Sequence, residues 1–269
     1  MDEEMEETVK YGLYKSFMPG FKAPAVHTVP QSRLIAEAVA AARASDVVIA
    51  CVGESQNMNG EGASRTDISI PDAQMELLKA LKATGKPVVM VLVTGRPLTL
   101  EWENEEMDAI LNVWSPGSEG GNAVADVLFG DVNPSGKLTM SFPKNVGQVP
   151  LYYAAKNTGR PLLEGRWFEK FRSNYLDVDN DPLYPFGYGL SYTDFDWSVK
   201  SFNYDKDEIT VKVNVKNTGD VAGKDVVQVY FSAPYYDYDL TDQYRKLKDI
   251  GNDSVYQKRY IADRSQSGK

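Results

Sequence analysis

Apolar residues recur at helical spacing just after residue 30, and a short run that is apolar throughout follows them. The helical positions are Leu34, Ile35, Ala38, Val39 and Ala42, and the apolar run covers residues 46–52. A second helical segment opens at Pro71 and precedes the apolar run 86–93. A third apolar run at 109–114 precedes a helical segment at 119–129. The pattern predicts amphipathic helices that alternate with buried strands.

Strands that are apolar on both faces are typical of a parallel sheet, because each crossover helix buries its apolar stripe against one face of that sheet. We therefore expect residues 31–150 to form an α/β domain, a three-layer α/β/α sandwich with a mainly parallel sheet. In such sheets ligands bind at the loops that leave the carboxyl ends of the strands. Here those loops are residues 53–70 and 115–121.

The remaining segments have other patterns. Residues 1–30 indicate an irregular segment, and residues 151–194 an aromatic segment, rich in proline and glycine, that wraps over a core. The period then becomes two, with apolar positions at Ile209, Val211, Val213 and Val215. A turn at 217–220 precedes a second strand at 226–231. Because this is fewer than the roughly seven strands of a complete sandwich, residues 195–269 are predicted to form a partial β-sandwich.

Composition narrows the class of protein. The 269 residues are 42% hydrophobic and 25% charged, which is typical of a globular chain. The 29 Lys and Arg residues are scattered and are outnumbered by 38 Asp and Glu residues, so nucleic acid is not an expected partner. No apolar run approaches the roughly 20 residues of a membrane span, and residues 1–30 lack the pattern of a signal peptide. We expect no membrane insertion.

Two scarce residue types limit the chemistry. Cys51 is the one cysteine, which excludes an internal disulfide, and its apolar surroundings predict a buried, unreactive thiol. His27 is the one histidine, which disfavours both a histidine-rich metal site and a Ser-His-Asp triad. Any catalysis would therefore rely mainly on carboxylates.

The loop 53–67 after the first predicted strand is the richest in candidate groups. Glu54 and Glu61 stand seven residues apart in it, and Arg65 can pair with either of them. A cationic partner would lower the pKa of a carboxyl group and burial would raise it, and the sequence leaves both open. A solvated surface loop is the alternative. A phosphate cradle is disfavoured, because the spacing fits no phosphate-binding fingerprint.

The loop 114–121 joins the third predicted strand to its helix. Pro116 and Gly117 predict a turn, and Glu119 favours the positive end of the helix dipole. A ligand contact by Trp114 or Glu119 is the alternative.

Seven motifs occur in an order that closely resembles the carboxyl-terminal half of glycoside hydrolase family 3, the β-glucosidase and β-xylosidase group. They are Val52-Gly-Glu54, Gly60-Glu-Gly-Ala-Ser-Arg-Thr-Asp67, Gly95-Arg-Pro-Leu98, Pro116-Gly-Ser-Glu-Gly-Gly121, Asp126-Val-Leu-Phe-Gly-Asp131, Pro134-Ser-Gly-Lys-Leu138 and Tyr184-Pro-Phe-Gly-Tyr-Gly-Leu-Ser-Tyr192. The resemblance covers residues 31–233, and residues 234–269 fit it poorly. It implies that residues 195–233 begin a fibronectin type III-like domain.

The resemblance also implies a division of catalytic labour. In that family a (β/α) barrel domain supplies an aspartate nucleophile, and the α/β domain supplies the general acid/base from its first long loop. Carried over by position, Glu61 is the acid/base and Glu54 the weaker alternative, while Ser64 and Arg65 hold the loop or border the leaving-group site. A retaining glycosidase needs two carboxyl groups about 5 Å apart. Residues 1–30 are too few for a barrel of about 250 residues, so we expect the isolated chain to be inactive.

The implied substrate is a β-linked glucoside or xyloside oligosaccharide, and the implied partner is a barrel domain in cis or in trans. No cofactor and no metal is required, and the family suggests a secreted or periplasmic location. One alternative is a noncatalytic module that binds carbohydrate or docks on a barrel-bearing partner, because sugar faces stack on aromatic rings such as those in residues 183–192. Another is a truncated chain that exposes an apolar patch.

Overall fold

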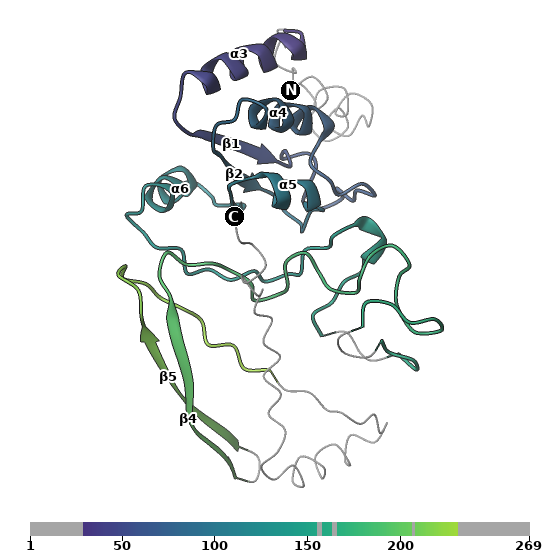
Figure 1. The fold of residues 1–269 in the computed structure, drawn as a ribbon, viewed down its shortest axis with the longest axis vertical. Coiled ribbons are helices and arrows are strands. Elements are labelled where there is room, and N and C mark those ends of the chain that lie inside the picture. The colour runs from purple at the N-terminus through teal and green to yellow at the C-terminus, as the bar shows by residue number, and fades with distance from the viewer. Residues whose placement is uncertain (1–28, 155–157, 163–165, 206–207, 231–269) are drawn as a thin grey trace. The chain divides into compact units, whose positions relative to one another are not determined.

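The computed structural model describes residues 29–154, 158–162, 166–205 and 208–230. These residues fall into two compact units (Figure 1). The first unit contains the described residues up to Leu128 together with residues 140–186, and the second contains residues 129–139 and the described residues from Gly187 onward. The predictions for residues 1–28 and 231–269 lie outside the described part of the chain.

The first unit contains the predicted alternation of helices and strands. Its elements are α3 (Gln31–Arg43), β1 (Val48–Gly53), α4 (Asp72–Lys82), β2 (Val88–Val93), α5 (Glu101–Glu106), β3 (Ala109–Trp114), α6 (Gly120–Leu128) and the 3-10 turn η1 (Val146–Gln148). Pro71 directly precedes α4 and Gly85 follows it with a positive φ of 76°, as the sequence predicted for a start and a stop. Helix α5 was not predicted.

The three strands form a parallel sheet in the order β1-β2-β3. The central strand β2 carries the core, because Val88, Met90 and Leu92 are each 0% exposed. Helix α4 packs on β1, and α3 packs on α4 (Figure 1). The parallel sheet with its helices agrees with the α/β fold that the apolar runs predicted.

Strand β1 lies at one edge of this sheet, and its side chains alternate between buried and exposed positions. Ala50 and Val52 are each 6% exposed, whereas Ile49 is 46% exposed. Cys51 is also exposed, so the prediction of a buried thiol was wrong. An apolar run alone does not distinguish an edge strand from a central one, because its composition says nothing of what covers each face.

The described residues between 140 and 186 are largely irregular, and several of them pack through aromatic rings. Phe142 is 1% exposed, and its N–H donates to the carbonyl oxygen of Tyr184 at 2.8 Å. The Phe142 ring lies 5.7 Å from that of Trp114 and 6.0 Å from that of Tyr184. Phe186 stacks on Tyr153 with 4.1 Å between the ring centres. These contacts anchor a segment that has little secondary structure.

The second unit is built on an antiparallel hairpin of β4 (Phe195–Asp205) and β5 (Glu208–Asn217). Directly paired residues share a face of the sheet, and the pairs on one face include Trp197 with Val215 and Val199 with Val213. A register shift between Val199 and Ser201 keeps Phe202 on this same face, opposite Val211. One face of the hairpin is therefore apolar along its length.

The second strand predicted at 226–231 is not formed by residues 226–230, which carry no strand assignment. Side chains hold this segment instead: Lys137 pairs with Asp225 at 3.0 Å, and the Gln228 amide donates to the carbonyl oxygen of Gly187 at 2.9 Å. Val226, Val227 and Val229 gave this segment the apolar character of a strand, but they do not indicate which neighbouring backbone it could pair with.

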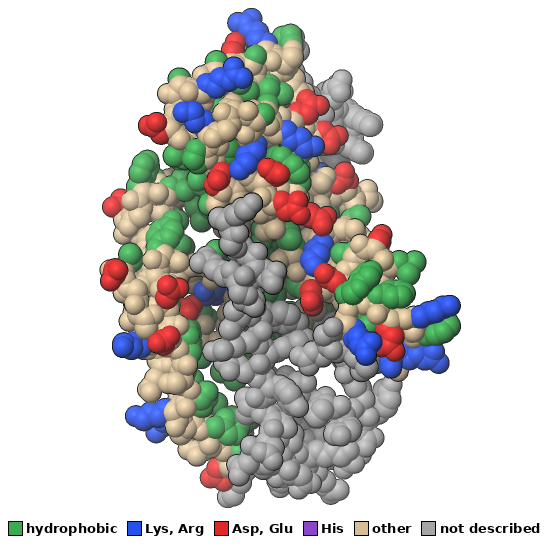
Figure 2. All heavy atoms as spheres, in the orientation of Figure 1, with side chains coloured by type: hydrophobic (Ala, Val, Ile, Leu, Met, Phe, Trp, Pro, Cys, Tyr) green, Lys and Arg blue, Asp and Glu red, His purple; other side chains and the backbone are tan. Residues whose placement is uncertain are grey.

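One face of the described part of the chain carries charges of both signs. On the face shown in Figure 2, blue basic side chains are interspersed with red acidic ones. None of the helices in the described ranges has the length and apolar character needed to cross a bilayer.

Candidate functional site

The candidate site begins where β1 ends. Gly53 has a φ of 134°, and a Cβ at this position would collide with the carbonyl group of Val93 on β2. The Gln74 side chain from α4 brackets the Gly53 backbone, accepting from its N–H at 2.7 Å and donating to its carbonyl oxygen at 2.9 Å. The N–H of the next residue, Glu54, donates to the carbonyl oxygen of Val93 at 2.9 Å. The chain therefore leaves the sheet in a fixed direction.

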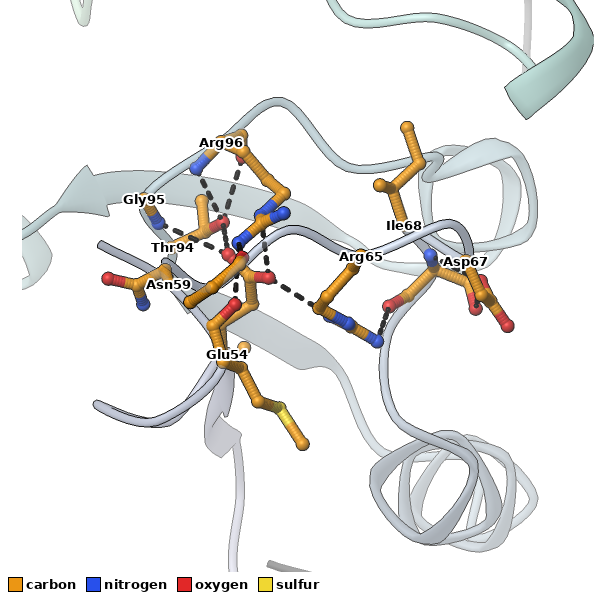
Figure 3. Close-up of polar contacts among 12 residues, drawn as sticks. Glu54, Asn59, Arg65, Asp67, Ile68, Thr94, Gly95 and Arg96 are labelled. Atoms are coloured by element: carbon orange, nitrogen blue, oxygen red, sulfur yellow. Dashed lines mark hydrogen bonds and ion pairs between the residues drawn. The ribbon is translucent and has the colours of Figure 1, made fainter. Parts of the chain in front are cut away.

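The Glu54 carboxylate lies at the centre of a buried polar cluster (Figure 3). Its side chain is 0% exposed, and its Oε1 lies 3.0 Å from Nη1 of Arg65 and 2.8 Å from Nε of Arg96. Its Oε2 accepts from the Thr94 hydroxyl at 3.0 Å and from the Gly95 N–H at 3.3 Å. A buried carboxylate with two cationic partners and two neutral donors is well satisfied, and it joins the loops that follow β1 and β2.

Arg96 also contacts the loop that contains Glu61. Its Nη2 donates to the carbonyl oxygen of Met58 at 2.5 Å and to that of Ala63 at 2.7 Å. Within the loop, the Asn59 amide donates to the Ser55 carbonyl oxygen at 3.1 Å. Glu61 itself is exposed. The loop backbone is thus fixed on both sides of an accessible carboxyl group.

The far end of the loop is tied to the segment after β2. Asp67 accepts from the Ser69 N–H at 2.9 Å and from the Ser69 hydroxyl at 2.6 Å, and the hydroxyl contact is the main cause that lowers the pKa of Asp67. Ser69 forms an isolated parallel bridge with Thr99. The loop is therefore attached at both ends and in its middle.

The structure separates the predicted site residues into two groups. Glu54 and Arg65 meet in the buried cluster. Of the two glutamates that the sequence offered as partners for Arg65, the structure therefore pairs Arg65 with Glu54. Glu61 and Ser64 are exposed on the loop. An exposed carboxyl group can exchange a proton with a bound molecule, whereas the enclosed carboxylate of Glu54 is committed to its partners.

The sequence analysis did not single out Thr94 or Arg96 as site residues, although Gly95-Arg-Pro-Leu98 is one of the seven motifs. The available signal was its position: it follows the strand next to the one that precedes the candidate loop, and carboxyl ends of parallel strands share one edge. An arginine at that position is placed to reach the candidate loop. The described residues contain no cluster of three or more His, Cys, Asp or Glu side chains suited to a metal ion.

The second loop has local partners for its candidate side chains. Trp114 has a φ of 51°, and its ring packs near that of Phe142. Glu119 precedes α6 and accepts from the Asn122 amide at 2.6 Å. The Glu119 contact agrees with a turn that leads into α6, and the Trp114 ring takes part in packing.

Comparison with known proteins places these features in a family. Residues 3–192 match the sequence profile of the glycosyl hydrolase family 3 C-terminal domain. Over 205 residues the chain is 55% identical to a periplasmic β-glucosidase from Salmonella typhimurium, covering 75% of this chain and 26% of that protein. Over 203 residues it is 44% identical to a β-xylosidase from Formosa agariphila, covering 74% of this chain and 27% of that protein.

Solved structures give the same result. A β-glucosidase from Listeria innocua, crystallised with gluconolactone, superimposes with a TM-score of 0.68 at 40% identity over 76% of this chain and 28% of that chain. The chain thus spans about a quarter of the length of the curated relatives, which are matched over 26% and 27% of their residues.

Proposed function

Because this chain belongs to glycosyl hydrolase family 3, with residues 3–192 matching its C-terminal domain, we propose that it supplies the general acid/base carboxylate of a retaining, exo-acting β-glycosidase. The acid/base is Glu61. The observation that carries this assignment is the exposed position of Glu61 on a loop whose backbone Arg96 holds at Met58 and Ala63.

The proposed reaction divides two roles between two carboxyl groups. An aspartate of a (β/α) barrel domain, in cis or in trans, attacks the anomeric carbon. Glu61 protonates the oxygen of the departing group and then removes a proton from the water that hydrolyses the glycosyl intermediate. A proton donor of this kind contributes a rate factor of roughly 10²–10⁴. No cofactor and no metal enters these steps.

The other candidate residues take supporting roles. The Glu54 side chain is 0% exposed and is held by Arg65 and Arg96, so it remains the weaker acid/base alternative. Arg65 holds the loop through that ion pair, and its Nη2 lies 3.5 Å from the Ser69 carbonyl oxygen. Ser64 is exposed close to Glu61 in sequence and borders the leaving-group site.

The proposed substrate is a β-linked glucoside or xyloside. This follows from relatives named β-glucosidase and β-xylosidase. A secreted or periplasmic location is proposed on the same ground, since one relative is named a periplasmic β-glucosidase.

We expect the isolated chain to give no turnover of an aryl β-glucoside, because the nucleophile is assigned to another domain.

The role of Glu61 is tested in a chimaera in which residues 31–192 replace the matching part of the Salmonella relative. Glu61→Gln should lower kcat about 100-fold or more, and azide should restore turnover of an aryl glycoside as glycosyl azide. The matched control is Glu37→Gln, at an exposed position on α3 that is distant from the loop in the sequence. Full activity of the Glu61→Gln chimaera, or robust turnover by the lone chain that this substitution abolishes, would contradict the proposal.

A noncatalytic carbohydrate-binding or barrel-docking module is the alternative. Its aromatic segment is used for packing in the first unit: the Tyr184 hydroxyl donates to Asn104 at 2.8 Å, and Phe186 stacks on Tyr153. These contacts favour packing over a sugar platform. Calorimetry of the lone chain with glucose, xylose and short β-glucans distinguishes the two, because binding heat would support the alternative.

A further inference from the structure

One guanidinium group connects the segment after β2 to the loop that contains Glu61 (Figure 3). The Nη2 atom of Arg96 donates to the carbonyl oxygens of Met58 and Ala63, at 2.5 Å and 2.7 Å. These two carbonyl groups lie on opposite sides of Glu61 in the sequence. Because a single nitrogen contacts both, it draws the two ends of the segment 59–62 together.

Arg96 is itself fixed by contacts that involve no ligand. Its Nε lies 2.8 Å from Oε1 of Glu54, whose side chain is 0% exposed, so solvent screens this attraction only weakly. The N–H of Arg96 donates to the Thr94 hydroxyl at 3.2 Å. The guanidinium therefore has a defined position before any substrate binds.

The segment between the two carbonyl groups also has short-range contacts: the Asn59 amide donates to the Ser55 carbonyl oxygen at 3.1 Å, and the Ala63 N–H donates to the Gly60 carbonyl oxygen at 3.3 Å. Gly60 and Gly62 have φ values of 101° and 74°, and a Cβ at either position would meet no atom within 4 Å. Glycines with open surroundings permit many backbone conformations. The Arg96 contacts are therefore well suited to select one of them.

A lysine could not replace this contact. The guanidinium places Nε 2.8 Å from the Glu54 carboxylate as an ion pair, without a hydrogen bond from Nε, and uses Nη2 as the donor to the two carbonyl groups. The two nitrogens have a fixed separation in a rigid plane. A lysine offers one nitrogen on a flexible stem in place of the two nitrogens used here, so it lacks the fixed spacing that joins the carboxylate to the two carbonyl groups. The substitution Arg96→Lys thus keeps the positive charge and removes the connection.

From these contacts we propose that Arg96 is a positioning residue for Glu61: it transmits the fixed position of the buried Glu54 to the loop and presets the acid/base before substrate binds. This proposal rests on the proposed role of Glu61. Arg96 does not itself touch the reacting atoms, and Glu54 acts as its anchor.

The test compares backbone hydrogen exchange in the full chain, in Arg96→Lys and in the matched control Arg33→Lys, whose arginine pairs with Glu37 on the exposed face of α3. The informative amides are those of Met58 and Ala63, which donate to Ser55 and Gly60 at 3.0 Å and 3.3 Å. In Arg96→Lys they should exchange about tenfold faster or more, while β2 amides and all amides of the control stay unchanged. Unchanged exchange at Met58 and Ala63 would overturn the proposal, and so would an equal loss of protection throughout β2.

Proteolysis gives a second measurement that does not depend on assigning single amides. A glutamate-specific protease should cut after Glu61 several-fold faster in Arg96→Lys than in the unchanged chain, since cleavage requires local opening of the loop. Equal cleavage rates would count against the proposal.

Kinetics of the chimaera separate this proposal from the one it rests on. Arg96→Lys should lower kcat more for an alkyl glycoside than for a nitrophenyl glycoside, because only the poor leaving group needs the proton. If Glu61→Gln leaves activity intact while Arg96→Lys still loosens the loop, the role of Glu61 fails and the positioning contact stands. If Glu61→Gln abolishes activity and Arg96→Lys changes neither the loop nor the kcat ratio, only the positioning proposal fails.

Discussion

Two of the described glutamates in the first unit are almost fully buried, and they differ in how their charge is satisfied. Glu54 has two arginines within 3.0 Å of its carboxylate. Glu103 on α5 is 1% exposed, and its Oε1 has no hydrogen-bond partner among the described residues. Burial raises the pKa of Glu103 above its ordinary value of 4.5, and the opposing effects of its own backbone N–H and of Lys79 are smaller. At neutral pH its charge is therefore a cost to the folded state.

Removing this charge should stabilise the chain in a pH-dependent way. A raised pKa means that the folded state binds the proton more tightly than the unfolded state, so stability falls as the pH rises from 4.5 through the folded-state pKa. Glu103→Gln abolishes that loss. We expect it to raise the unfolding free energy by about 1 kcal/mol at pH 7, or Tm by about 2–4 °C, with the gain shrinking toward zero at about pH 4.

Thermal unfolding at the two pH values measures the effect. The exposed neighbour Glu105→Gln is the control and should change Tm little at either pH. An unchanged or lower Tm for Glu103→Gln at pH 7 would show that the buried carboxylate is satisfied after all.

Some residues of the candidate site could be predicted from the sequence, and others could not. The carboxylates Glu54 and Glu61 and the cation Arg65 could be found in one loop, because the loop follows an apolar run. Which carboxylate is enclosed depends on Arg96, which lies on another loop. Contacts of this kind are set by the alignment of β1 with β2, and no local pattern encodes that alignment.

Among the elements, those with a clear apolar period were predictable and those without one were not. The amphipathic helices α3 and α4 follow from their spacing of apolar residues. Helix α5 has the sequence Glu-Trp-Glu-Asn-Glu-Glu, in which one apolar residue cannot set a period. The apolar run of β1 predicted a strand, but its position at the sheet edge depends on the sheet order.

The edge position of β1 gives a prediction for its cysteine. Cys51 is exposed next to an exposed Ile49, so its thiol should react with a disulfide reagent such as DTNB in the folded chain. We expect a rate within about tenfold of that of the chain unfolded in guanidinium, measured by the released thiolate. Cys51→Ser should give no reaction. A thiol that reacts only after unfolding would show that its face of β1 is covered.

On the scale of the whole molecule, the two units are stabilised to different degrees. The first unit has a central strand whose side chains are enclosed. The second has a hairpin whose apolar face remains partly open, since Val199 is 61% and Ile209 is 52% exposed.

The sequence predicted both the buried strands of the parallel sheet and the alternating strand of the hairpin from their patterns of apolar residues. It could not predict how many strands pair in the second unit, because pairing joins segments that are distant along the chain.

This difference should appear in the rates of hydrogen exchange across the chain. Amides of β2 are paired on both sides and covered by buried side chains, so they should be the slowest to exchange. Amides of β4 and β5 belong to a two-stranded sheet, which is marginally stable by itself, and should exchange about 100-fold faster or more than those of β2.

Leu92→Ala, which removes a fully buried side chain, should lower the unfolding free energy by about 2–5 kcal/mol and bring the exchange rates of β2 toward those of the hairpin. The control Val199→Ala, at a largely exposed position, should leave β2 unchanged. Equal protection of β2 and the hairpin in the unchanged chain would mean that the apolar face of the hairpin is as well covered as the central strand.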